Sequence, residues 1–194
     1  DTVGAVTLSS GTISGAGTLT GSSYNLTNSG TISAALAGSG TLTKSGAGTV
    51  TLSGNNTYTG LTDIQAGTLS LGRSGGTIAD TASVQVSGGT LDVAYADTVG
   101  AVTLSSGTIS GAGILTGSSY NLTNSGTISA VLAGNGALFK SGAGTVTLSG
   151  ANTYTGLTDV QAGTLAYGAS DVIANNASVK VSGGTLNIGA NSDT

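Results

Sequence analysis

Residues 42–72 read LTKSGAGTVTLSGNNTYTGLTDIQAGTLSLG, and the pattern returns at residues 138–168 as LFKSGAGTVTLSGANTYTGLTDVQAGTLAYG. The two copies lie 96 residues apart. They belong to a longer match, because residues 1–72 align with residues 97–168 without a gap and differ at only nine positions. The chain is therefore a tandem duplication, and the structure of one repeat sets the structure of the whole.

The register between the copies slips by one residue beyond residue 72, so that the GGTL at 88–91 corresponds to the GGTL at 183–186. We refer to residues 1–96 as unit 1 and to residues 97–194 as unit 2, and we predict that they form one continuous solenoid. Both units open on the tetrapeptide DTVG. We therefore expect the chain to be part of a longer protein, with any signal peptide and translocator outside it.

Charged residues are scarce, at 6% of the chain, and the formal net charge is −4. The few bases do not cluster as phosphate binding requires, so we expect neither nucleic acid nor an anionic membrane as a partner. They are Lys44, Arg73, Lys140 and Lys180. No apolar run is long enough to cross a bilayer, and we expect no membrane insertion of this segment. Leu, Ile and Val nevertheless recur at short intervals, which a disordered chain lacks.

Short segments alternate an apolar residue with Thr or Ser, as in TVTL at 49–52 and TLSL at 68–71. This alternation predicts β-strands with one apolar and one hydroxyl-rich face, and no segment supports a helix. Such short strands cannot bury their apolar side chains alone, so each must stack on the next turn of a coil. With roughly 20 to 25 residues per coil, the sequence predicts an all-β parallel solenoid of about 8 to 10 coils, in which Leu52 and Leu148 point inward.

Gly-Ala-Gly segments punctuate the strands at 15–17, 46–48, 111–113 and 142–144. They lack the Lys and the following helix of a phosphate-binding loop, and we predict tight corners there. Neither end of the chain resembles a cap. We therefore also predict that the end coils associate head to tail or continue into further repeats.

Three motifs of the first copy carry a family resemblance: KSGAGT at 44–49, LSGNNTYTG at 52–60 and QAGTL at 65–69. Together they closely resemble the autotransporter-associated β-strand repeat, or passenger-associated transport repeat, of bacterial type V secreted passenger domains. The SVQVSGGTL at 83–91 looks like the coil that often follows this repeat.

The resemblance implies a right-handed parallel β-helix that is exported across the outer membrane of a Gram-negative bacterium and displayed on the cell surface. It also implies a non-catalytic, adhesin-like stalk or fibre segment, and leaves any ligand on a cell surface or matrix unspecified. Apolar ladders would fill the interior while backbone hydrogen bonds run along the long axis, so each added unit would extend the reach of the protein.

Two aspartates in equivalent positions are the first candidates for chemistry. Asp63 and Asp159 are separated by a full unit of rise, roughly 19 to 24 Å. A glycosidase needs its two carboxyls about 5 to 9.5 Å apart, so the pair cannot form one catalytic dyad.

Asp80 and Asp92 are candidates to approach Asp63 from neighbouring coils. Their counterparts in unit 2 are Asn175 and Asn187, and this exchange favours a turn or capping role over catalysis. The chain has no His, Cys or Glu from which to complete a catalytic or zinc site. We assign no catalytic, cofactor-binding or metal-binding residue and expect no enzyme.

Lys44 and Lys140 open the two copies of the motif. We interpret them as edge or solubility charges beside a strand, with binding of an acidic saccharide as the alternative. Tyr58 and Tyr154 are interpreted as packing over an apolar corner, with stacking on a sugar as the alternative.

Two other functions stay open. Thr-x-Thr triplets stacked on one face would resemble the array of an ice-binding β-helix; they occur at 18–20, 41–43, 49–51 and 57–59. Unit 2 breaks this pattern at three positions, where Thr18, Thr41 and Thr43 are replaced by Ile114, Ala137 and Phe139. A carbohydrate-active β-helix enzyme is the second alternative, since a fold alone does not decide activity.

Overall fold

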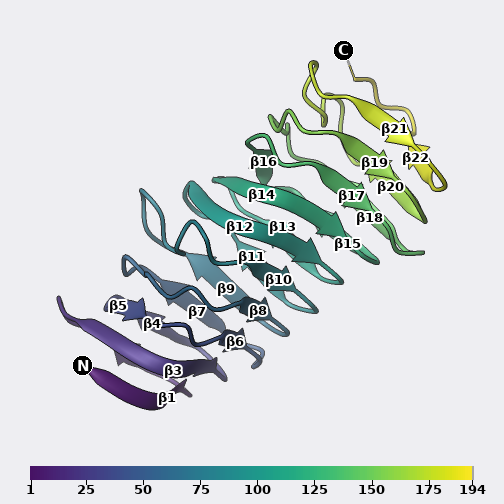
Figure 1. Ribbon diagram of the computed structural model, residues 1–194. Coiled ribbons are helices and arrows are strands. Elements are labelled where there is room, and N and C mark those ends of the chain that lie inside the picture. The colour runs from purple at the N-terminus through teal and green to yellow at the C-terminus, as the bar shows by residue number, and fades with distance from the viewer. Residues whose placement is uncertain (194) are drawn as a thin grey trace.

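The computed structural model describes residues 1–193, which form strands, turns and loops and include no helix that could span a membrane. Figure 1 shows the strands stacked coil upon coil, with the N-terminus at one end of the stack and the C-terminus at the other. Neighbouring strands pair in parallel, both within a unit and across the unit boundary. The prediction of an all-β parallel solenoid is confirmed.

Two long sheets run along the stack. Sheet A has 12 strands in the described chain. Its main path is β1 (Thr2–Leu8), β3 (Thr18–Leu26), β6 (Leu42–Lys44), β8 (Thr62–Ile64), β10 (Val84–Val86), β12 (Asp97–Leu104), β14 (Ile114–Leu122), β17 (Leu138–Lys140), β19 (Thr158–Val160) and β21 (Val179–Val181). Beside this path, β5 (Ala35–Ala37) pairs with β3, and β16 (Val131–Ala133) pairs with β14.

Sheet B has ten strands within residues 1–193. They follow the order β2 (Thr12–Ile13), β4 (Gly30–Ile32), β7 (Thr49–Leu52), β9 (Thr68–Leu71), β11 (Thr90–Asp92), β13 (Thr108–Ser110), β15 (Gly126–Ile128), β18 (Thr145–Leu148), β20 (Thr164–Tyr167) and β22 (Thr185–Asn187). Each coil contributes one strand to this sheet and one to the main path of sheet A. The described chain therefore makes about ten coils, the upper end of the predicted range.

The length of a coil follows from the register of sheet A. Successive partners are 18, 18, 20, 22 and 18 residues apart along the series Val6, Tyr24, Leu42, Thr62, Val84 and Val102. These five steps total the 96 residues of unit 1, so one unit is five coils. Most coils are shorter than the expected 20 to 25 residues because glycine-rich corners join the strands tightly.

Apolar side chains of both sheets fill the interior of the stack. Leu52 lies between Ile32 and Leu71 of the neighbouring coils, and its side chain is fully buried. Leu148 is buried to the same extent in unit 2. The inward orientation predicted for both leucines is confirmed, and burial of each contributes about 1.5–3 kcal/mol.

The four Gly-Ala-Gly segments lie at bends between strands, as predicted. Several of their glycines touch the preceding coil: a Cβ on Gly46 would lie 1.5 Å from the carbonyl oxygen of Thr27, and one on Gly113 would lie 2.5 Å from the carbonyl group of Tyr95. Gly17, the counterpart of Gly113 in the first coil, has nothing within 4 Å in the described structure. The corners therefore need glycine because another coil packs against them.

The Thr-x-Thr triplets do not share one face. Residues 18–20 and 41–43 follow sheet A, residues 49–51 lie in sheet B, and residues 57–59 lie outside the strands. Sheet B has a different threonine row, which joins Thr49, Thr68, Thr90, Thr108, Thr127 and Thr147 before it reaches Ala166. The row beside it contains Ser and Asp as well as Thr, so the surface is mixed and does not form a regular threonine array.

The last coil exposes residues that inner coils bury. Val179 and Val181 in β21 are 43% and 51% exposed. Their counterparts in unit 1, Val84 and Val86, are 1% and 0% exposed, because β12 pairs with β10 and covers them. The difference comes from the position of the coil in the stack.

Candidate functional site

Lys44 lies where the sequence analysis did not expect it. The prediction of an exposed solubility charge is wrong for both Lys44 and Lys140, whose side chains are fully buried. The Lys44 ammonium group donates hydrogen bonds to the carbonyl oxygens of Gly46 and, at 3.3 Å, Ala66; Lys140 repeats both contacts in unit 2. Burial lowers the pKa of both ammonium groups. Each lysine joins its own corner to the next coil and is not available to an acidic saccharide.

Tyr58 and Tyr154 pack over an apolar corner, as predicted, and both are fully buried. The hydroxyl groups of Tyr58 and Thr62 share a hydrogen bond of 2.7 Å, and the Tyr58 ring centroid lies 5.9 Å from that of Tyr24. The rings of Tyr120 and Tyr154 have the same separation in unit 2. Burial raises the pKa of Tyr154 to about 12 and raises that of Tyr58 as well. Neither ring is exposed, so neither can stack on a sugar.

Asn56 links three consecutive coils through its side-chain amide. Its Oδ1 accepts a hydrogen bond from the Leu36 N–H at 2.9 Å, and its Nδ2 donates to the Thr77 carbonyl at 2.7 Å. Asn152 makes the equivalent bonds in unit 2. The sequence reasoning missed this role, although the recurrence of NTYTG next to each buried tyrosine was a signal for it.

Asp97 opens unit 2 and fastens it to unit 1. Its buried carboxylate accepts hydrogen bonds from the N–H groups of Thr77 and Ile78, both at 3.0 Å. Burial raises the pKa of this carboxyl, while the two N–H groups act in the opposite direction. The sequence reasoning missed Asp97 as well, because its partners lie in a loop about 20 residues earlier and only the coil register brings them together.

Asp63 and Asp159 occupy equivalent positions of sheet A, five coils apart, or roughly 24 Å; Asp63 is partly exposed, whereas Asp159 is buried. They cannot act together, which agrees with the expectation. Asp159 accepts a hydrogen bond from Ser182 at 2.6 Å and pairs with Lys180 at 3.5 Å. The Ser182 hydroxyl has the largest effect in lowering the pKa of Asp159, and Lys180 adds to it. Asp63 accepts the matching bond from Ser87 at 2.7 Å.

Asp80 and Asp92 have different roles. Asp92 belongs to sheet B, whereas Asp63 belongs to sheet A, so the two do not meet. The turn or capping role expected for Asp92 is wrong, because it lies in β11 and accepts a hydrogen bond from Ser70 at 2.7 Å. The turn role is confirmed for Asp80, which lies in a turn closed by a 2.8 Å hydrogen bond between the Ala82 N–H and the Ala79 carbonyl.

The buried polar side chains serve the cohesion of the stack. Each buried side-chain nitrogen or oxygen in the described part of the chain has a hydrogen-bond partner. Between residues 1 and 193, no three His, Cys, Asp or Glu side chains gather closely enough to hold a metal ion. We call Lys44, Asn56 and Tyr58, with Lys140, Asn152 and Tyr154 in unit 2, the corner cluster. The lysines bind backbone carbonyls, the asparagines bind a backbone N–H group and a backbone carbonyl, and the tyrosines bind a threonine hydroxyl. Through the lysines and asparagines the corner cluster joins consecutive coils.

Comparison with known proteins places the corner cluster inside a family motif. The model of the passenger-associated-transport-repeat matches residues 42–71 and 138–166, which confirms the resemblance found in the sequence. A segment of 66 residues, 34% of this chain, is 44% identical to the "Adhesin BmaC autotransporter" of Brucella suis biovar 1 (strain 1330). The matched segment spans 2% of that adhesin. No solved structure matches the chain significantly.

Proposed function

We propose that this chain, which carries two passenger-associated transport repeats, is a structural stalk segment of an autotransporter-type protein exposed outside a bacterial cell. The continuity of the stack across the unit boundary carries this proposal: β10 pairs with β12 in sheet A, and β11 pairs with β13 in sheet B. About ten coils at about 4.8 Å each give a rod of roughly 48 Å. A continuous rod with a filled core holds its two ends at a fixed distance.

The similarity to an autotransporter adhesin supports a place for this segment in an adhesin-like surface protein. In this proposal the segment sets the distance between its two ends and does not itself bind a ligand. Its most distinctive side chains, those of the corner cluster, are buried and satisfied by neighbouring coils. Adhesion by the parent protein then depends on the segment only through the distance that the segment spans.

The test uses the parent protein on the surface of the cell that produces it. In one variant the nine residues that distinguish 97–168 from 1–72 are exchanged for those of unit 1, which changes side chains and keeps the number of coils. In a second variant residues 97–192 are deleted, which removes one 96-residue period. A stalk predicts unchanged adhesion of cells for the first variant and reduced reach for the second.

An epitope inserted beside exposed Ser74 reports whether each variant reaches the cell surface, by antibody labelling of intact cells. Loss of adhesion in the first variant, with normal labelling, would show that the segment itself binds a ligand. An epitope that is accessible only after cell lysis would contradict the extracellular location.

A further inference from the structure

We propose that the Asn135–Gly136 pair is a site of spontaneous deamidation, at which Asn135 loses its side-chain amide and the coil packing directs the product toward aspartate. This inference does not rest on the stalk function, and its only co-reactant is water. The chain contains a single Asn-Gly pair, and unit 1 has Ser39 and Gly40 at the same corner. The site therefore belongs to unit 2 alone, and unit 1 provides a matched position for a control.

The reaction takes place within the chain until its last step. The backbone nitrogen of Gly136 loses its proton and attacks Cγ of Asn135. The new N–Cγ bond closes a cyclic imide, and the side-chain nitrogen leaves as ammonia after taking up a proton from the solvent. Water then opens the imide, and the Gly136 nitrogen recovers its proton. Attack of water at Cγ gives aspartate and restores the main chain, whereas attack at the backbone carbonyl carbon gives isoaspartate, in which the main chain runs through Cβ and Cγ.

The two reacting groups of this pair are unrestrained by hydrogen bonds. Asn135 is exposed and lies in the bend between β16 and β17. Within residues 1–193, neither its side-chain amide nor the N–H of Gly136 makes a hydrogen bond. Because glycine has no Cβ, the residue after Asn135 also places no side chain beside the attacking nitrogen.

Several other asparagines are held by the stack. Asn25 and Asn121 lie within the long strands β3 and β14 of sheet A. Asn56 and Asn152 are buried, and the N–H of the threonine that follows each of them donates a 2.8 Å hydrogen bond to a carbonyl of the preceding coil. The backbone nitrogen needed for the reaction is therefore restrained at the buried pair.

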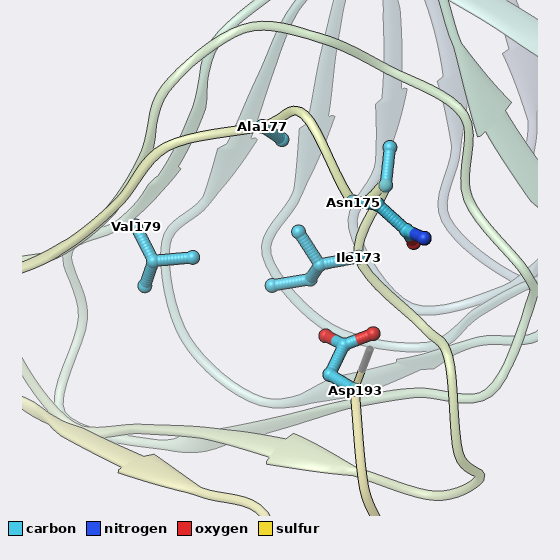
Figure 2. A pocket seen from close by; sticks show the side chains of 6 residues that line it. Ile173, Asn175, Ala177, Val179 and Asp193 are labelled. Carbon is cyan, nitrogen blue, oxygen red and sulfur yellow. The ribbon is translucent and has the colours of Figure 1, made fainter.

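The remaining competitors are exposed but are followed by a residue with a side chain. Asn175 lines the hollow in the last coil, where Figure 2 shows its amide, and the next residue is Asn176. Asn28 and Asn124 are each followed by a serine. A Cβ on the following residue hinders the approach of its nitrogen to the amide, so these asparagines are expected to react more slowly than Asn135.

The main chain at Gly136 has little space to move, which decides the product. A Cβ on Gly136 would lie 2.6 Å from the carbonyl oxygen of Gly117, and a Cβ on Gly156 would lie 2.3 Å from the carbonyl oxygen of Gly136. The Ala137 carbonyl accepts a 2.9 Å hydrogen bond from the Tyr120 N–H. Isoaspartate would add a carbon atom to the main chain at this point and displace these contacts. Aspartate keeps the main chain and adds one negative charge to the net charge of −4.

The test compares the folded chain with the chain unfolded in guanidinium chloride, both kept in mildly alkaline water enriched in heavy oxygen. The label enters the new carboxylate when the imide opens, so mass spectrometry of fragments separates this reaction from deamidation during digestion. In the folded chain Asn135 is expected to gain the label before Asn28 and Asn124. The site is overturned if folded Asn135 stays unlabelled while the unfolded chain converts, or if Asn28 or Asn124 reacts first.

Two variants exchange the residues of the matched corners. Asn135→Ser introduces the residue of unit 1 and is expected to prevent the early acidic form that isoelectric focusing detects in the parent chain. Ser39→Asn creates an Asn-Gly pair in unit 1, where a Cβ on Gly40 would likewise lie 2.6 Å from a carbonyl oxygen, that of Ser22. This variant is expected to gain a second acidic form at a similar rate. An acidic form that persists in Asn135→Ser, or no second form in Ser39→Asn, contradicts the assignment.

The product is tested by the share of isoaspartate, measured by enzymatic methylation of that residue. The unfolded chain gives the share that the chemistry alone sets, and the folded chain is expected to give a smaller one. Asn135→Asp carries the aspartate product from the start and is expected to melt at the same temperature as the parent chain. Equal shares of isoaspartate in both states, or a lowered melting temperature of Asn135→Asp, would show that the packing of Gly136 does not favour aspartate.

Discussion

Most of the differences between the two copies of the repeat lie on their outer surface, and few lie in the interior. Of the nine differences between residues 1–72 and 97–168, seven fall at positions that are partly or fully exposed in both copies. The two buried differences pair Ile64 with Val160 and Leu71 with Tyr167. All six residues of the corner cluster, in contrast, are identical between the copies, with matching hydrogen bonds. The corner cluster therefore makes the same contacts between coils in both units.

The loop that follows each copy of the motif, in contrast, differs between the two units in sequence and in length. In unit 1, Arg73 donates hydrogen bonds to the carbonyls of Gly75 and Gly76 at 3.1 and 2.6 Å, and the corresponding loop of unit 2 has no arginine. The coil that contains this loop is 22 residues long in unit 1 and 21 in unit 2. The one-residue slip between the copies is absorbed here, because the loop lies outside both sheets and leaves their register unchanged.

The largest loss of stability is expected from a substitution at Leu52, in the interior. Leu52→Asp places a carboxylate between two apolar coils, and we expect a loss of more than about 4 kcal/mol in the free energy of unfolding. Thr51→Asp, one residue away and facing outward, is the control and is expected to change stability by less than about 1 kcal/mol. Thermal unfolding followed by circular dichroism measures both, and equal melting temperatures would refute the inward assignment.

The next effect separates an inner coil from the first coil. Gly113→Ala places a methyl group against the Tyr95 backbone and is expected to cost about 1–3 kcal/mol. Gly17→Ala at the equivalent position meets no neighbour and is expected to be nearly neutral in the monomer. Urea unfolding of both variants at low protein concentration compares them directly. A similar cost at both sites would mean that the coil packing does not explain the need for glycine.

An effect of similar size tests whether the two corners are energetically equal. Tyr58→Phe and Tyr154→Phe each leave a buried threonine hydroxyl without its phenol partner, which is expected to cost about 1–3 kcal/mol in either unit. In unit 1, the double variant Tyr58→Phe with Thr62→Val removes both polar partners and is expected to recover part of that loss. Urea unfolding provides the measurement; a cost in only one unit would show that identical contacts do not have identical energies.

The last effect is a change of stability with pH that appears only at alkaline pH. The folded chain retains the proton of Tyr154, whose pKa is raised to about 12, while the unfolded chain loses it near the ordinary value of 10.0. The contribution of Tyr154 is therefore fully present below pH 10 and is lost as the pH rises toward 12. The lowered pKa values of the buried lysines act in the opposite sense and favour folding as the pH rises toward 10.5.

Melting temperatures measured between pH 9 and 12 are expected to fall at the alkaline end, and to fall less steeply in Tyr154→Phe. An identical slope for parent and variant would show that this phenol does not contribute to the pH dependence.

Local alternation predicts the solenoid well but leaves the contacts between coils undetermined. It assigns Leu52 to the interior, and it also places Lys44 in phase with Leu42 within β6. The general tendency of lysine to remain in solvent led to the wrong expectation, because the carbonyls that bind its ammonium group belong to a corner and to the next coil. The role of Asp97 could not be predicted for a related reason, because the sequence does not show which loop lies beside its carboxylate.

The burial of two lysines also limits the sites at which trypsin can cleave the folded chain. Trypsin cuts after Lys or Arg and needs an accessible, extended backbone around the bond. Of the four such residues, Lys44 and Lys140 are enclosed in the corners, which leaves a cut after Arg73 in its loop or after exposed Lys180 in the last coil. The ammonium groups that hold neighbouring coils together thereby conceal two of the four tryptic sites until the coils separate.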